Sequence, residues 1–154
     1  MRRIFVLSCM AVLGGGCCST ACRIPETEYT RNTPEQTFEL FQRAARCDDV
    51  DAAYATISSD SHISPSDFTD AWSVAGDRIR ALCHTELARL EDEPASRRQP
   101  AKKATFRYGE HTVAFLVVQE DGKWLFQYPT RYHTEDELKA LMETIGDEAG
   151  DCCD

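Results

Sequence analysis

The chain has 154 residues, of which 28% are charged, and it carries a formal net charge of −9 at neutral pH. This length suffices for one domain, and an acidic surface repels nucleic acid and anionic lipid headgroups. The sequence therefore predicts a single domain that does not bind nucleic acid.

The first sixteen residues have the order of a secretory signal. Arg2 and Arg3 precede a short apolar run that ends at Leu13, and three glycines follow it. The run is too short to cross a bilayer as a stable helix, which requires about 20 apolar residues. We therefore expect residues 1–16 to direct the chain out of the cytosol and then to be removed.

The end of this signal resembles the lipobox of bacterial lipoproteins, in which an aliphatic residue and two small residues precede the cysteine that receives the lipid. Here Leu13 and three glycines precede Cys17, one small residue more than the pattern has. The resemblance implies that Cys17 is acylated and anchors the protein in the cell envelope. Because Cys18 follows it instead of Asp, the outer membrane is favoured over the inner one. The alternative is an ordinary signal that leaves a soluble secreted or periplasmic protein.

Six cysteines remain beyond the signal and Cys17. An even number outside the cytosol predicts disulfides, and no metal is expected because the clusters lack the usual spacing of zinc ligands. The pairing stays open. Cys47 and Cys83 lie inside the expected fold and either pair or remain buried thiols, while a bond between the two ends of the chain would hold the tail. The disulfide candidates are Cys18, Cys22, Cys47, Cys83, Cys152 and Cys153.

Four segments carry the apolar period and the end signals of helices. The first begins at a capping box that starts with Thr33, and the last begins at another that starts with Thr134. Gly146 is expected to end the last helix. The expected helices are 33–47, 50–57 after a cap at Asp48 or Asp49, 65–82 after a cap at Ser64, and 134–146.

Between the third and fourth helices the apolar period changes to two, as in β-strands. The run from Val113 to Val118 is apolar on both faces, which is typical of a central strand covered on both sides. Asp121 and Gly122 predict a hairpin. The expected strands are 104–108, 111–119 and 123–128, after a loop at 91–103, while 84–90 stays open between helix and strand.

Two stretches resemble the nuclear-transport-factor-two-like superfamily: 33–58 resembles its opening helical pair, and 113–128 its closing hairpin. The resemblance implies an α+β fold with N-terminal helices packed on a curved antiparallel sheet. The chain departs from this superfamily in showing only three clear strands and in having an extra C-terminal helix. The cone that the curved sheet forms in this superfamily is therefore either open here or filled by that helix. The expected layout is a lipidated tether over 17–32, the domain over 33–146 and an acidic, cysteine-containing tail over 147–154.

The residues expected inside the cone are the candidates for a site. Enzymes of this superfamily place acid–base groups there, and His62 and His84 are the candidates in this chain, although spacing fixes no pair of groups. The aromatic residues of the expected fold either form plain core or line a ligand cavity. The cavity candidates are Tyr54, Trp72, Phe115, Trp124 and Phe126.

The sequence favours a noncatalytic domain, anchored in the cell envelope, that binds a partner protein or a small apolar ligand. The anchor, the cone-like layout and the lack of converging polar residues support this function, and no cofactor is expected. Two alternatives stay open. One is a small hydrolyase or isomerase that uses a histidine of the cavity, and the other is a structural surface domain stabilised by disulfides.

Overall fold

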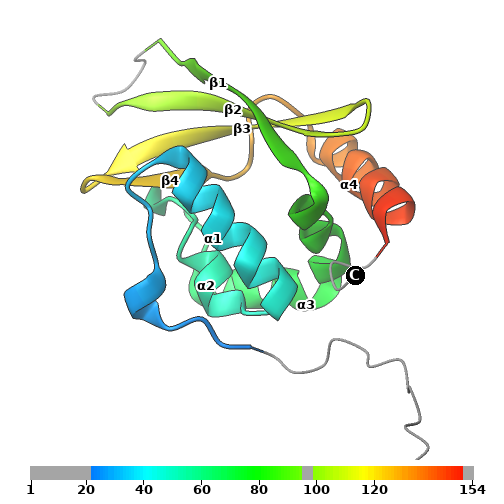
Figure 1. The fold of residues 1–154 in the computed structure, drawn as a ribbon, viewed down its shortest axis with the longest axis horizontal. Coiled ribbons are helices and arrows are strands. Elements are labelled where there is room, and N and C mark those ends of the chain that lie inside the picture. The colour runs from blue at the N-terminus through cyan, green and yellow to red at the C-terminus, as the bar shows by residue number, and fades with distance from the viewer. Residues whose placement is uncertain (1–21, 95–98, 151–154) are drawn as a thin grey trace, which may run out of the picture.

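The computed structural model describes residues 22–94 and 99–150. The chain has an α+β fold in which helices lie on one side of a four-stranded antiparallel sheet (Figure 1). A last helix packs at one end of the sheet. The fold class expected from the sequence is confirmed.

The helices begin where the sequence places their caps. The side chain of Thr33 accepts a hydrogen bond from the backbone of the first turn, and Thr134 forms a complete capping box with Glu137. Asp49 caps the second helix, while Asp48 lies in the left-handed conformation that ends the first. The helices are α1 (Pro34–Cys47), α2 (Val50–Tyr54), α3 (Pro65–Arg80) and α4 (Glu135–Ala149), with 3-10 turns at Glu26–Glu28, Ser59–Ser61 and Ala81–His84.

The end of α4 differs from the expectation. Gly146 does not end the helix, which continues to Ala149 and is followed by Gly150 with a positive φ. Gly146 instead lies where α4 passes close to Ala81, since a Cβ at this glycine would be 3.6 Å from the Cβ of Ala81. At this distance a Cβ would make only an ordinary van der Waals contact, so the approach of the two elements does not require glycine here.

The sheet has four strands in the order β1-β2-β3-β4, one more than the three that were clear in the sequence. The segment left open at 84–90 contains most of the extra strand, and the expected loop at 91–103 is shorter because both of its ends belong to strands. Cross-strand charge pairs support these ends, with Lys102 Nζ 2.6 Å from Asp92 Oδ1. The strands are β1 (Glu86–Asp92), β2 (Ala101–Tyr108), β3 (His111–Glu120) and β4 (Lys123–Gln127).

The central strand and its hairpin are as expected. Asp121 and Gly122 both have positive φ and connect β3 to β4 in a tight turn. Residues 113–118 of β3 are buried on both faces. The helices cover one face, and the chain that follows β4 is fastened to β3, since the hydroxyl of Thr130 donates to the carbonyl of Ala114 at 2.7 Å.

Phenylalanines from α1 and from three strands form the centre of the core. Phe38 of α1 stacks on Phe106 of β2 with ring centroids 4.2 Å apart, and Phe41 meets Phe126 of β4 edge to face at 6.3 Å. Phe115 of β3 contacts the rings of both strand neighbours at about the same distance, 6.0 Å. These ring contacts fix α1 against the sheet.

The described part of the predicted tether, residues 22–32, is packed on the domain. Cys22 is disulfide-bonded to Cys47 at the end of α1. Ile24 is only 4% exposed, and its backbone N–H donates to the Asp49 carboxylate at 2.7 Å. These residues therefore belong to the folded domain, and they do not act as a free spacer.

The Cys22–Cys47 bond excludes both alternatives considered for Cys47, a bond to Cys83 and a buried thiol. Cys83 takes part in another disulfide. The other disulfide candidates, Cys18, Cys152 and Cys153, lie outside the described residues. So do the signal segment and Cys17. No helix within the two described ranges is long and apolar enough to span a membrane.

Removal of the Cys22–Cys47 bond should destabilise the domain, because the bond joins residues 25 positions apart and restricts the unfolded chain. The chain-entropy model gives a loss of about 3.5 kcal/mol in the free energy of unfolding for a loop of this size. Urea unfolding of the double variant Cys22→Ser/Cys47→Ser measures it. A loss below about 1 kcal/mol would mean that packing at Ile24, and not the bond, holds this segment.

A carboxylate at the end of β3 fastens the chain that leads into α3. Glu120 accepts hydrogen bonds from the hydroxyls of Ser58 and Ser59 and from the backbone N–H of Ser59. Partial burial raises the pKa of Glu120, but these hydrogen bonds outweigh burial, so the pKa lies below its ordinary value of 4.5. The ionised form therefore contributes to stability.

Because the pKa of Glu120 is lower in the folded chain, its contribution is complete above about pH 4.5 and is lost as the pH falls through the folded pKa. Glu120→Gln should lower stability at pH 7 and make the loss of stability below pH 4.5 less steep. Thermal unfolding across this pH range measures both effects, with Glu110→Gln in an exposed turn as the control. If Glu120→Gln lost stability below pH 4.5 as steeply as the native chain does, the stabilising role of the ionised Glu120 carboxylate would be contradicted.

Candidate functional site

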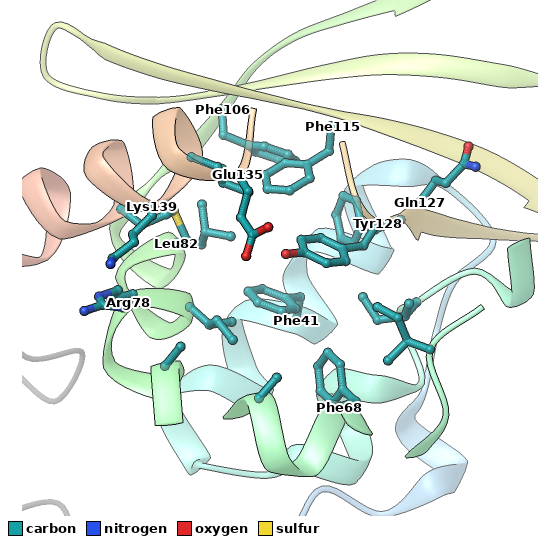
Figure 2. Close-up of a pocket in the computed structure, with 18 of the residues that line it drawn as sticks. Phe41, Phe68, Arg78, Leu82, Phe106, Phe115, Gln127, Tyr128, Glu135 and Lys139 are labelled. Atoms are coloured by element: carbon teal, nitrogen blue, oxygen red, sulfur yellow. The ribbon is translucent and has the colours of Figure 1, made fainter. Parts of the chain in front are cut away.

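A cavity of about 410 Å³ lies between the helices and the helix-covered face of the sheet (Figure 2). Its inner wall consists of the phenylalanine rings that join α1 to the sheet. Cavities of 300–1,000 Å³ with a largely apolar lining are typical of small-molecule sites. The aromatic residues of this wall are Phe38, Phe41, Phe106, Phe115 and Phe126.

Small residues on α3 leave room for the cavity. Ala71 and Ala75 line it one helical turn apart, at positions where longer side chains would fill the space. On the opposite side, Leu138 and Met142 of α4 line it with the same spacing. The two helices therefore both contribute to the wall of the cavity, and they contact each other at its edge.

Polar side chains gather where the cavity opens to solvent. Figure 2 shows Arg78 of α3 and Lys139 of α4 together at one edge, with the Glu135 carboxylate and the Tyr128 hydroxyl pointing toward each other beside them. Arg78 is held in an ion pair, with its Nε 2.8 Å from a carboxylate oxygen of Glu143. The opening thus carries both charge signs, while the inner wall is apolar.

The opening also carries exposed apolar surface. Val74 of α3 is 85% exposed and lines the cavity, and so does Tyr128, which is 37% exposed. They are the large hydrophobic side chains that stand out as exposed among the described residues. Exposed apolar side chains beside an apolar cavity are typical of a ligand-binding site.

The phenol of Tyr128 remains a hydrogen-bond donor at neutral pH. Burial is the main cause that raises its pKa above 10.0, and the negative charge of Glu135 raises the pKa further. A protonated phenol can both donate and accept a hydrogen bond, whereas an ionised carboxylate can only accept. The two groups therefore offer complementary partners to a polar atom placed between them.

Two of the five aromatic residues expected to line a cavity do so, namely Phe115 and Phe126. The other three lie elsewhere. Tyr54 donates its hydroxyl to the carbonyl of Ile63 at 2.9 Å, and Trp124 is half-buried at the hairpin. Trp72 lies in the core. Its indole N–H donates to Asp48 at 2.8 Å. Core and cavity aromatics share the same period, so the sequence could not separate them.

Neither candidate histidine lines the cavity. His62 is exposed in the left-handed residue that follows a 3-10 turn. His84 is half-buried, and its Nε2 lies 3.0 Å from the carbonyl oxygen of Gly150 at the end of α4. Among the described residues, no group of three His, Cys, Asp or Glu side chains is placed to hold a metal ion.

Sequence reasoning missed the polar residues at the opening. Tyr128 had a signal, since it continues the alternation of Trp124 and Phe126 at the end of the last strand. For Glu135 and Lys139, the sequence contains no signal of a site beyond their place on an amphipathic helix. Their proximity to Tyr128 depends on how α4 packs beside α3 and β3, which no local pattern reveals.

Comparison with known proteins gives no match: no family model, no curated protein and no solved structure matches the chain. The function must therefore be argued from the geometry of the cavity and its opening.

Proposed function

We propose that the protein is a noncatalytic, envelope-anchored domain that binds one small, largely apolar molecule in the cavity. The observation that carries this proposal is the apolar cavity of about 410 Å³, which opens to the surface. Transfer of apolar surface from water into such a space contributes about 25 cal/mol per Å². The phenylalanine wall offers no partner for a charged or strongly polar group, so the body of the ligand must be apolar.

The cavity also separates this function from its alternatives. A hydrolyase or isomerase that uses a histidine would need that side chain at the cavity, and neither His62 nor His84 lines it. A purely structural surface domain would gain stability from a filled core, because empty space costs packing energy. An open apolar cavity is therefore better explained by a ligand than by a structural role.

The lipoprotein signal and the superfamily resemblance belong to the same proposal. A pair of helices followed by an antiparallel meander around a cavity agrees with a nuclear-transport-factor-two-like domain. Since Cys22 is bonded to the domain, only residues 18–22 would connect it to an acylated Cys17. Five residues span at most about 18 Å. The domain would stay close to the membrane surface, where apolar molecules concentrate.

Binding of the neutral fluorescent dye N-phenyl-1-naphthylamine to the purified protein tests the proposal. We expect saturable binding of one dye molecule, visible as a rise in fluorescence. Ala75→Trp should weaken binding at least about tenfold, since the indole fills the cavity. Ala140→Trp makes the same change at an exposed position of α4 outside the cavity and should bind as the native chain does.

Two results would contradict the proposed function. One is dye fluorescence that does not saturate, which would indicate adsorption to the surface. The other is equal binding by Ala75→Trp and Ala140→Trp while both variants retain the native circular dichroism spectrum, because the dye would then bind outside the cavity.

A further inference from the structure

The chemistry of the opening narrows the class of ligand, on the assumption that the proposed function holds. The Tyr128 hydroxyl and the Glu135 carboxylate both line the cavity and point toward each other (Figure 2). Within the described part of the chain, neither group has a hydrogen-bond partner. The two groups interact through charge, because Glu135 raises the pKa of the Tyr128 phenol. The polar end of a bound molecule can therefore lie between them.

The charges at the opening disfavour an ionic group in that place. A carboxylate or phosphate there would meet the negative charge of Glu135 and could not donate a hydrogen bond to it. An ammonium group could donate to Glu135 but has no lone pair to accept a hydrogen bond from the Tyr128 phenol, and it would also meet the positive charge of Lys139 at the same opening. Like charges close together in a partly desolvated site cost free energy. A neutral group avoids both costs.

A hydroxyl matches both partners. Its oxygen accepts a hydrogen bond from the phenol of Tyr128, and its hydrogen is donated to the carboxylate of Glu135. The bond to the carboxylate is charge-assisted and so stronger than one between neutral groups. A keto oxygen can accept from Tyr128 but cannot donate to Glu135, so it satisfies one partner only.

We propose that the ligand is a neutral amphiphile, with an apolar body that fills the cavity and a hydroxyl bound between Tyr128 and Glu135. Val74 lines the cavity with an exposed side chain and so adds apolar surface at the opening. The phenylalanine wall takes up the apolar body, and the pair at the opening selects its polar end. Alcohols and phenols form the chemical class that fits this arrangement.

Competition for the bound dye tests this inference with three probes of equal chain length: 1-octanol, octanoate and octylammonium. We expect 1-octanol to displace N-phenyl-1-naphthylamine at a concentration about tenfold lower than either ion. Tyr128→Phe and Glu135→Ala should each reduce this preference for the alcohol several-fold. The preference is a ratio of two affinities in the same variant, so it does not depend on a general change in affinity.

Matched variants serve as controls. Tyr108→Phe removes a phenol hydroxyl and Asp136→Ala removes a carboxylate at positions that do not line the cavity, and both should keep the native preference. Octanoate or octylammonium binding as tightly as 1-octanol would overturn the inference, and so would a preference that survives both Tyr128→Phe and Glu135→Ala. These results leave the proposed function standing. Failure of the dye to bind at all would instead overturn the proposed function, and this inference with it.

Discussion

The stacking of α1 on the sheet determines the shape of the rest of the molecule. Phe38 on Phe106, and Phe41 against Phe126, hold one end of the helix-covered face in close aromatic contact. Trp72 extends this network to α3, because its ring meets that of Phe41 edge to face with centroids 6.4 Å apart. The rings keep α3 at a fixed distance from the sheet, so the space beside them must be filled by side chains of α3 and α4 or stay open. Small residues on α3 leave it open.

The position of α4 gives the cavity its chemistry. The helix starts at the capping box of Thr134, after the loop that follows β4, and Glu135 in its first turn points toward Tyr128. Leu138 and Met142 close the apolar side, whereas Glu135 and Lys139 reach the solvent-facing opening. An apolar interior with polar groups only at its edge favours a molecule with one polar end. The disulfide at Cys22 matters for a different reason, because it fastens the segment nearest to the expected lipid anchor.

The elements that sequence reasoning predicted are those with strong local signals. Thr33 and Thr134 mark helix starts through hydrogen bonds within one turn, and Asp121-Gly122 marks its hairpin through backbone conformation alone. The strand Glu86–Asp92 lacked such a signal, since it is rich in charge and depends on pairing with β2. The cavity was less predictable still. Its polar residues come from separate elements, and the aromatic pattern that suggested Phe115 and Phe126 equally suggested Trp72, which lies in the core.

A crystal structure of the protein under xenon pressure tests the central claim most directly, because apolar cavities bind xenon. We expect density for xenon, or for an apolar molecule retained through purification, beside Phe41 and Phe115 and between α3 and α4. A structure in which the side chains of α3 and α4 meet across this space, with no xenon bound there, would contradict the existence of the cavity and the function built on it.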